Sequence, residues 1–583
     1  MSDATMTISE ANALLVAPGQ MFEVDDAIIR GVRTKIWKHA PASLRVILDM
    51  SLAHGDKDFI VYEDERYTFD RHYRIACTLA QRLIDRGVAK GDRVAIAARN
   101  LPEWIFSFWG ASLAGAIAVP LNAWWTGEEL AYGISDSGTS IIVVDEDRLA
   151  RIRPHLDELD YLHEVIVVSE RRGAAPELGS AHDRIRISSF GDVLGDVDPG
   201  AVPPDITIDP DDDATIFYTS GTTGRPKGAV GTHRNAITNL MNLFFAGQRS
   251  TMRFGGGNVS ADGRDLQNAF LLSVPLFHAT GCLAILIVNT AAGGKLVMTH
   301  HFDAGQALQL IEREEITTIG GVPTIAMQIL DHPDFDKYDL SSIRSVSYGG
   351  APSPPELVRR IRAAFPLGQP GNGYGLTETS AAIAGNNGPD YVAKPDSCGP
   401  CYPINEVAVV PEDYDGAEPG DELPVGPDVV GELWIKGPNV VRGYWNKPEE
   451  TALTFTQGWL HSGDVARIDE EGFIFIVDRA KDMIIRGGEN VYSVEVEAAL
   501  FEHPDVADCA VIGIPHPVLS EEVGAVVVLR PGRHVEAEEL MRHAAVKLAK
   551  FMVPTKIFFR SEPLPRNPAG KVLKRQLRTE VVD

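Results

Sequence analysis

Cysteine, positive charge and long uninterrupted apolar runs are all scarce in this chain. Its five cysteines are too few and too scattered among 583 residues for a disulfide framework, so we expect a reducing, cytoplasmic environment. The net charge of −27 excludes the basic footprint that nucleic acids require. We therefore expect no nucleic-acid partner.

The apolar runs predict neither a membrane span nor an export signal. Residues 274–294 lack charge, but Pro275, His278 and Asn289 interrupt them, so we expect a buried turn followed by a core helix. The opening MSDATMTISE is acidic where a secretory signal would be basic. The sequence leaves the oligomeric state open, a homodimer included.

The most informative stretch is 217–230, FYTSGTTGRPKGAV. Its glycines permit the positive φ angles with which a backbone closes on an anion. Hydroxyl donors and one cation stand among them: Ser220, Thr222, Thr223 and Lys227. The Walker pattern needs four residues between its glycines and then Lys-Ser/Thr, so a P-loop NTPase is disfavoured. We expect a polyphosphate site rather than a flexible Ser/Thr/Gly linker, because a linker needs no such donors.

From about Pro41 helix and strand patterns alternate, which predicts a wound α/β domain with parallel strands covered on both faces. Tyr73–Leu83 has helical spacing, and Arg93–Ala98 reads as a short buried strand. The strand Ala214–Tyr218 delivers the glycine-rich loop, as ligand loops follow the carboxyl ends of strands. Residues 1–40 show no clear period and are expected to form an arm.

The second half of the chain predicts two further units. Short strands and Pro/Gly turns at about 391–478 predict a small β subdomain. Residues 480–583 carry 14 Lys+Arg against 15 Asp+Glu, whereas the preceding part has a net charge of −26, so a boundary is expected at the charged break 478–482. The expected fold is α/β: an N-terminal domain at 41–478 and a small, mobile α+β domain at 479–583.

Two glycine-rich motifs suggest a nucleotide pocket. The turn Gly349-Gly350-Ala351 would let a flat ligand lie against bare backbone, although a tight βα turn explains it almost as well. In GNGYGLTET at 371–379, Tyr374 is suited to stack on a base. Glu378 beside a phosphate site would need a cation between the two anions, which makes it a candidate magnesium ligand.

Other positions are ambiguous from the residues alone. Cys398 and Cys401 have a dithiol redox spacing, but a strand-like segment follows them instead of a helix. From composition alone, a histidine such as His278 is more often a core residue than a functional one. An aspartate such as Asp464 usually caps a turn, and a lysine such as Lys571 is usually a solvated charge. The polar, glycine-rich segment 249–265 receives no role.

Seven motifs occur in an order that resembles the adenylate-forming superfamily, which contains acyl-CoA synthetases, luciferases and peptide-synthetase adenylation domains. The resemblance covers roughly residues 50–578. The motifs are YTSGTTGRPKG, LFH, GGAP, GYGLTE, GYWNKPEET…GWLHSGD, DRAKDMIIRGGENVYSVEVE and PRNPAGKVLKR. The resemblance also places Cys398 and Cys401 in a segment that is similar to the family's G-x-P-x-P-x-x-E pattern, so we expect no redox role for them.

The resemblance implies ATP, Mg²⁺ and coenzyme A as ligands beside a small-molecule carboxylic acid. It implies Lys571, Glu378 and His278 as catalytic residues and Glu378 and Thr222 as metal ligands. Phosphates, adenine and ribose would be held by Thr219, Ser220, Gly221, Thr222, Thr223, Gly224, Lys227, Gly349, Gly350, Ala351, Asn372, Gly373, Tyr374, Gly375, Thr377, Asp464 and Arg479. Lys571 would reach the α-phosphate and the substrate carboxylate.

The family pattern also implies two working orientations of the C-terminal domain. After adenylation it would rotate about Lys481, withdraw Lys571 and bring Gly487 and Gly488 forward, where bare glycines let the pantetheine arm of coenzyme A pass. This predicts an AMP-forming acyl-CoA ligase. An acyl-AMP ligase that serves a carrier protein and a non-catalytic nucleotide-binding protein remain alternatives.

Two branches of the superfamily are disfavoured. The chain ends soon after Lys571, where a peptide-synthetase module would continue into a carrier domain, and Ile485 replaces a lysine of luciferases. The acyl pocket is expected near Phe277, His278 and Gly349-Gly350. The absence of bulk at Gly349 and Gly350 permits a long or broad apolar acid. We expect medium- or long-chain fatty acids first and aryl or arylalkyl acids second.

Overall fold

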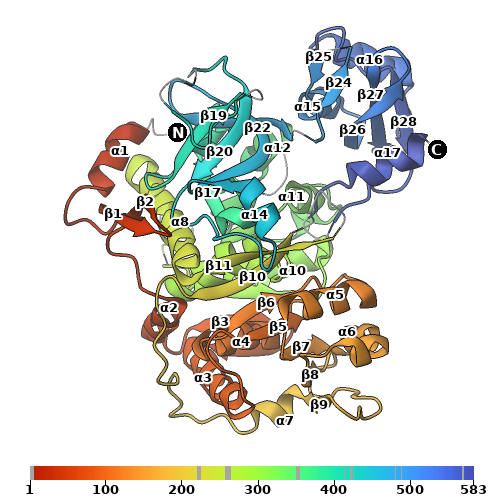
Figure 1. The fold of residues 1–583 in the computed structure, drawn as a ribbon. Helices are drawn as coiled ribbons and strands as arrows, with labels where there is room; N and C mark the ends of the chain where they lie inside the picture. Colours follow the sequence, from red (N-terminus) through yellow and green to blue (C-terminus); the bar gives the residue numbers. More distant parts are fainter. Residues whose placement is uncertain are drawn as a thin grey trace.

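The computed structural model describes residues 6–219, 225–255, 264–349, 355–411, 414–420, 423, 426–479, 481–487, 489–567 and 570–582. The predicted fold class is confirmed: a large α/β domain and a small antiparallel sheet precede a small C-terminal domain (Figure 1). The small domain, blue to violet in the figure, stands to one side of the antiparallel sheet.

The first large sheet has seven described strands in the order β11-β10-β6-β5-β7-β8-β9, and only β11 runs antiparallel to its neighbour. Along β5, Val94 and Ile96 join one core cluster while Ala95 and Ala97 join another, so both faces of the sheet are covered. The strands are β5 (Arg93–Ala97), β6 (Ile117–Pro120), β7 (Ile141–Asp145), β8 (Glu164–Val168), β9 (Arg186–Ser189), β10 (Asp213–Thr219) and β11 (Lys227–Thr232).

The second large sheet has eight described strands in the order β17-β16-β15-β14-β12-β13-β3-β4. Its inner strands are parallel and each edge strand is antiparallel. The strands are β3 (Asp58–Tyr62), β4 (Glu65–Thr68), β12 (Ala269–Leu272), β13 (Lys295–Met298), β14 (Thr318–Gly321), β15 (Ser345–Gly349), β16 (Gln369–Leu376) and β17 (Ala381–Asn387).

Helices α3 (Phe69–Asp85), α4 (Pro102–Leu113) and α8 (His233–Phe254) share the largest core cluster with residues of both sheets. Helix α4 is apolar on nearly all sides, and Trp104 and Trp109 are fully buried, as expected of a helix enclosed by other elements. The other helices of the large domain are α1 (Ile8–Leu15), α2 (Leu44–Ser51), α5 (Gly127–Ser137), α6 (Glu146–Ile152), α7 (Phe190–Leu194), α9 (Ile287–Ala292), α10 (Ala304–Arg313), α11 (Pro323–Leu330), α12 (Pro355–Ala364), α13 (Pro389–Ala393) and α14 (Pro448–Thr454).

The smaller sheet of this domain is antiparallel and follows the order β18-β23-β22-β20-β19, with β21 paired to β22. Its last strand ends at Arg479, and the next strand of the chain begins at Ile484 in another sheet. The strands are β18 (Gly399–Pro400), β19 (Glu406–Val410), β20 (Gly431–Lys436), β21 (Phe455–Thr456), β22 (Trp459–Ile468) and β23 (Phe473–Arg479).

The small domain packs three helices with a five-stranded sheet in its described part, and Val511, Val523 and Leu540 lie in its own core cluster. It therefore has an apolar core separate from that of the large domain. Its elements are β24 (Ile484–Arg486), β25 (Glu489–Val491), α15 (Ser493–Phe501), β26 (Val506–His516), β27 (Ser520–Leu529), α16 (Ala537–Ala545), β28 (Lys556–Arg560) and α17 (Lys574–Val582).

The first forty residues are more regular than the sequence predicted. Residues 6–40 include α1 and the hairpin of β1 (Val24–Ile29) and β2 (Val32–Trp37). Thr7 and Glu10 make a capping box at the start of α1, and the indole Nε1–H of Trp37 donates to Asn242 of α8 at 2.9 Å. The arm is tied to α8 by such long-range contacts, which sequence periodicity does not reveal.

Two other expectations can be compared with the structure. The stretch 274–294 forms a turn, a π-helical segment (Thr280–Leu286) and α9, largely buried, as predicted. Cys398 and Cys401 are not disulfide-bonded, strand β19 follows them, and burial raises both thiol pKa values to about 12. Such thiols are poor redox groups at neutral pH.

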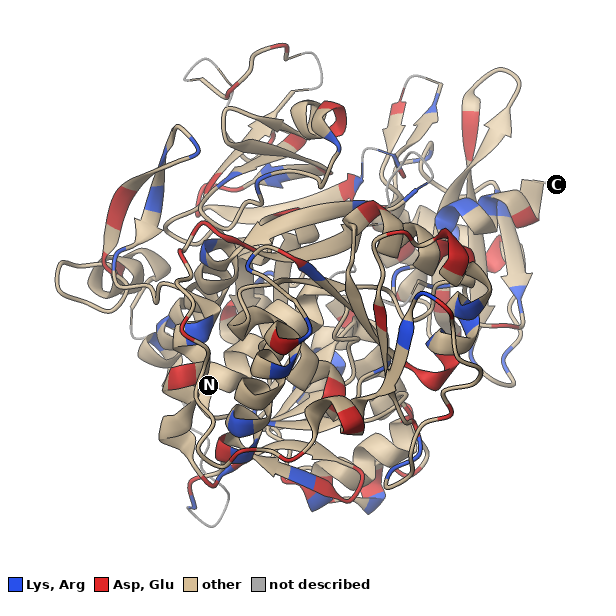
Figure 2. Ribbon diagram, turned by 60° about the horizontal axis from the view of Figure 1, so that its bottom comes forward, with Lys and Arg blue, Asp and Glu red and all other residues tan. Residues whose placement is uncertain are grey.

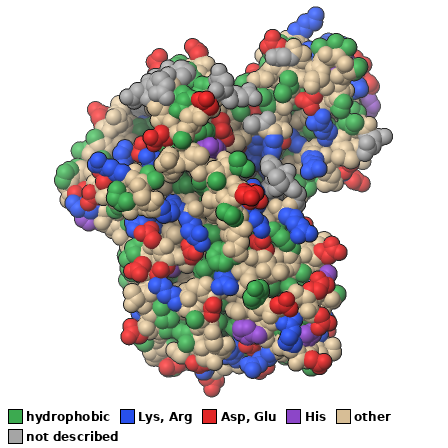
Figure 3. All heavy atoms as spheres, in the orientation of Figure 1, with side chains coloured by type: hydrophobic (Ala, Val, Ile, Leu, Met, Phe, Trp, Pro, Cys, Tyr) green, Lys and Arg blue, Asp and Glu red, His purple; other side chains and the backbone are tan. Residues whose placement is uncertain are grey.

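Acidic residues occur on many elements of the ribbon instead of gathering on one of them (Figure 2). Basic side chains gather where the small domain meets the large one (Figure 3). No helix in the described ranges is long and apolar enough to cross a membrane.

Candidate active site

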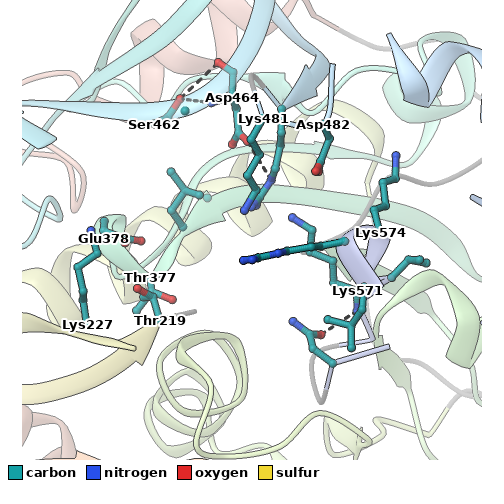
Figure 4. A pocket seen from close by; sticks show the side chains of 18 of the residues that line it. Thr219, Lys227, Thr377, Glu378, Ser462, Asp464, Lys481, Asp482, Lys571 and Lys574 are labelled. Carbon is teal, nitrogen blue, oxygen red and sulfur yellow. Dashed lines mark hydrogen bonds and ion pairs between the residues drawn. The ribbon is translucent and has the colours of Figure 1, made fainter. Parts of the chain in front are cut away.

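A cavity of about 1560 Å³ lies where the two domains meet (Figure 4). Carboxyl ends of four large-domain strands open onto it through Thr219, Gly321, Gly349 and Leu376. Ligand sites of α/β sheets lie at such strand ends. The small domain contributes Lys571, so both domains line one space.

Lys227 marks the wall formed by β10 and β11. The two strands pair antiparallel with Thr219 opposite Lys227, and both residues line the cavity. The ammonium of Lys227 lies 4.7 Å from the centre of the Tyr444 ring. The predicted phosphate residues Ser220, Gly221, Thr222, Thr223 and Gly224 lie outside the described residues.

Glu378 shares Tyr444 with Lys227. Its Oε1 accepts a hydrogen bond from the Tyr444 hydroxyl at 2.8 Å. Burial and this carboxylate raise the pKa of Tyr444 far above its usual value, so the phenol stays a donor. One tyrosine therefore positions a cation and an anion. Figure 4 shows Lys227 and Glu378 on the same side of the cavity.

Asp464 is held from three sides at the end of the cavity nearest the domain junction. It accepts from the Tyr374 hydroxyl at 2.7 Å, pairs with Arg479 Nε at 3.2 Å, and donates its N–H to Ser462 Oγ at 3.1 Å. The register of β22 and β23 places Asp464 opposite Arg479. Only 3% of Asp464 is exposed, so its carboxylate is fixed in orientation.

Two glycines of the cavity wall, Gly349 and Gly375, leave no room for a side chain. A Cβ on Gly349 would lie 2.6 Å from the Gly373 carbonyl oxygen, and one on Gly375 would lie 1.6 Å from that of Ala381, so neighbouring backbone excludes larger residues there. His278 precedes the π-helical segment, and burial lowers its pKa to about 4. Its imidazole is therefore neutral near pH 7.

A tight turn presents Lys571 to the cavity. The Lys571 N–H donates to Asn567 Oδ1 at 2.9 Å, and Arg566 Nη1 donates to the Gly570 carbonyl at 2.7 Å. Gly570 has φ +77° and packs so closely on the large domain that a Cβ there would lie 2.6 Å from Val322. The turn is thus fixed within its own domain and docked on the other.

The surroundings of Lys571 disfavour its charged form. Burial and the positive charges of Arg479 and Lys481 outweigh Asp482 and Asp464 and lower the pKa of Lys571 to about 7. A polyphosphate in the cavity would supply the missing negative charge. The arrangement therefore favours an anionic ligand between Lys227 and Lys571.

The structure brings together most of the predicted residues that it describes. Those that line the cavity are Thr219, Lys227, His278, Gly349, Gly375, Thr377, Glu378, Asp464, Arg479, Lys481 and Lys571. Among the described residues Asn372, Gly373, Tyr374 and Gly487 do not line it. Gly350, Ala351 and Gly488 lie outside the described residues.

Three contributors were missed from the sequence. Tyr444 positions Lys227 and Glu378, Val322 receives the Lys571 turn, and Ser462 holds Asp464. Tyr444 stands in GYWNKPEET, a motif that marked it as relevant without revealing its contacts. The Val322 contact joins segments far apart in sequence and leaves no local signal.

The chain matches the family model described as "AMP-binding enzyme" over residues 50–445 and the model "AMP-binding enzyme C-terminal domain" over residues 495–571. The chain belongs to the AMP-binding enzyme family. The predicted adenylate-forming superfamily is therefore confirmed, and the protein is an AMP-forming acid–CoA ligase.

The relatives of this AMP-binding enzyme have names that mention different acids. It is 35% identical over 512 residues to a feruloyl-CoA synthase of Amycolatopsis sp, covering 88% of this chain and 93% of the relative. It is 34% identical over 556 residues to a long-chain-fatty-acid–CoA ligase of Bacillus subtilis (strain 168), covering 92% and 94%. The crystal structure of the anthranilate CoA ligase AuaEII with anthranoyl-AMP has a TM-score of 0.79 at 26% identity, covering 92% and 97%.

Competitive amine labelling followed by peptide mass spectrometry tests the charge of Lys571. In the free protein we expect its labelling to rise with a midpoint near pH 7, because its surroundings lower the pKa from 10.5 to about 7. Lys337 is a matched control, because its hydrogen bond to Asp334 raises its pKa above 10.5. Added MgATP should protect Lys571 and move its midpoint upward; a midpoint near 10 without ATP would contradict this account.

Proposed function

We propose that this AMP-binding enzyme activates a hydrophobic carboxylic acid as acyl-AMP and then transfers the acyl group to coenzyme A. Medium- or long-chain fatty acids are the favoured substrates, and aryl or arylalkyl acids come second. The observation that carries the proposal is the shared cavity, where Lys571 of the small domain faces Glu378 and Lys227 of the large one. A cation near the end of the chain thereby reaches the large domain's ligand site.

In the first half-reaction, a carboxylate oxygen of the acid attacks the α-phosphorus of ATP. The bond from that phosphorus to the bridging oxygen breaks, and pyrophosphate leaves with the electron pair. Negative charge grows on the phosphoryl oxygens, and a positioned cation stabilises it most when water is excluded. We assign this role to Lys571, with Lys227 beside the β- and γ-phosphates.

Magnesium enters as part of the MgATP substrate. No group of three or more His, Cys, Asp or Glu side chains within the described ranges forms a metal site by itself. Glu378 fits an ion that protein carboxylate and substrate phosphates share, which is the usual arrangement for Mg²⁺. Glu378 would hold the ion, and Thr222 is the second proposed ligand. The ion would neutralise phosphate charge.

The nucleoside is assigned to the end of the cavity where Asp464 and Arg479 lie. Asp464 is fixed by Tyr374, Ser462 and Arg479, so it is oriented before a ribose hydroxyl donates to it. Tyr374 does not line the cavity. We therefore propose that it orients Asp464 and does not stack on the adenine. Gly349, with Gly350 and Ala351 from the sequence motif, is proposed for the adenine.

In the second half-reaction the coenzyme A sulfur attacks the acyl carbonyl carbon. The bond to the AMP oxygen breaks, AMP leaves, and the thiol proton is released. Neutral His278 adds no charge beside the acyl group and, with a pKa of about 4, is a weak base in the free protein. The proposed rotation about Lys481 would replace the Lys571 turn by the face that carries Gly487 and Gly488.

A panel of acids tests the proposal and its alternatives. AMP release is measured with and without coenzyme A for medium- and long-chain fatty acids, arylalkyl acids and aryl acids. We expect coenzyme A-dependent AMP release, highest for the fatty acids. Acyl-AMP release without consumption of coenzyme A would instead select an acyl-AMP ligase, and ATP binding without turnover of any acid would contradict catalysis.

Replacement of Lys571 separates the two half-reactions. In Lys571→Ala we expect acid-dependent pyrophosphate exchange to fall roughly 10²–10³-fold, the scale of removing one group that stabilises charge in a transition state. Conversion of preformed acyl-adenylate and coenzyme A to thioester should continue. Equal loss of both half-reactions would show that Lys571 lacks the assigned role.

A further inference from the structure

A buried set of polar side chains crosses the joint between the two domains. Asp478 lies in β23 of the large domain, whereas Ser493 begins α15 and Lys574 begins α17 of the small domain. The Ser493 N–H donates to Asp478 Oδ2, and its Oγ–H donates to Asp478 Oδ1 at 3.1 Å. Lys574 Nζ donates to Ser493 Oγ at 2.6 Å. We call Asp478, Ser493 and Lys574 the polar latch.

Two members of the polar latch are buried, and Lys574 is largely covered, with 18% of its side chain exposed. Asp478 is 2% exposed and Ser493 is fully buried. Lys574 also pairs with Glu497 at 2.7 Å, and the Val511 N–H donates to that carboxylate. Hydrogen bonds to charged groups in such surroundings are stronger than exposed ones, and a buried partner left without them is costly.

Ser493 occupies a position where the backbone N–H makes no hydrogen bond within the helix. It is the first residue of α15, where proline is preferred because the N–H has no partner within the helix. Here the N–H is used, because it donates to Asp478 across the joint. The serine therefore supplies two hydrogen bonds to Asp478 that a proline would not.

The polar latch is connected to the turn that carries Lys571. Lys574 follows Lys571 by three residues, and the Leu573 N–H donates to the Pro565 carbonyl at 2.8 Å, closing the same turn. Lys574 is held by Ser493 and Glu497, and Ser493 is held by Asp478, so these contacts limit where Lys571 can lie. Figure 4 shows Lys571 and Lys574 on the same side of the cavity.

We propose that Asp478, Ser493 and Lys574 position Lys571 by locking the small domain in its adenylating orientation. The inference rests on the proposed function, because it assumes that the domain turns about Lys481 between half-reactions. Ser493 and Lys574 would move together, and Asp478, on the other side of the joint, would lose both hydrogen bonds from Ser493. The polar latch stabilises the first orientation and must open before the second.

Two variants of Ser493 test the proposal. Ser493→Pro removes both donors to Asp478 yet suits the helix start, since Tyr492 has φ −84° and ψ 114°, which the residue before a proline tolerates. Ser493→Ala keeps the backbone donor and removes only the hydroxyl. We expect acid-dependent pyrophosphate exchange to fall roughly tenfold in the proline variant and less in the alanine variant. Thioester formation from preformed acyl-adenylate should be unchanged or faster in both.

Arg530→Ala is the matched control. Arg530 of the small domain pairs with Asp331 of the large domain at 3.6 Å, but both side chains are more than a third exposed, so the pair crosses the interface without burial. Its loss should change exchange less than twofold. Thermal unfolding checks that the proline variant is folded. If it is not folded, the exchange rate of the alanine variant alone tests the proposal.

Two results would overturn the polar latch: exchange equal to wild type in the Ser493 variants, or equal losses in both half-reactions, which indicate a merely structural role. If the wild-type protein catalyses no pyrophosphate exchange with any acid of the panel, the proposed function itself is overturned. The two failures are therefore distinguishable, because the wild-type assay separates them.

Discussion

The whole arrangement depends on one ammonium group, that of Lys571, placed between two domains. Burial and the neighbouring cations Arg479 and Lys481 disfavour its charge, while Asp482 and Asp464 only partly compensate. A bound polyphosphate would remove this imbalance. The proposed domain rotation would then be coupled to ligand binding, because the ligand would supply negative charge beside Lys571.

The residues that line the cavity come from two domains with separate cores. Strands of both large sheets end at the cavity. Gly349 and Gly375 stand where neighbouring backbone leaves no room for a side chain. Tyr444 and Asp464 are held by hydrogen bonds within the large domain. The small domain has its own core, and its Lys571 turn docks on Val322. A separate core is what the proposed change of position requires.

The sequence predicted what local patterns and ordered motifs carry. The strand before the glycine-rich loop was expected at Ala214–Tyr218 and spans Asp213–Thr219, and the family motifs named Glu378, Asp464 and Lys571. Contacts between distant segments were not predictable. The pairing of Tyr374 with Asp464, the packing of the first forty residues on α8 and the role of Ser493 depend on tertiary structure. Tertiary contacts override local propensity in such places.

The most direct test is a crystal structure with a non-reactive acyl-adenylate analogue in which a sulfamate replaces the α-phosphate. The account predicts that Nζ of Lys571 lies within hydrogen-bond distance, about 3 Å, of the sulfamate oxygens, with Asp464 on the ribose. An analogue bound in this cavity while Lys571 remains out of reach, with the small domain still docked through Gly570 and Val322, would contradict the central claim.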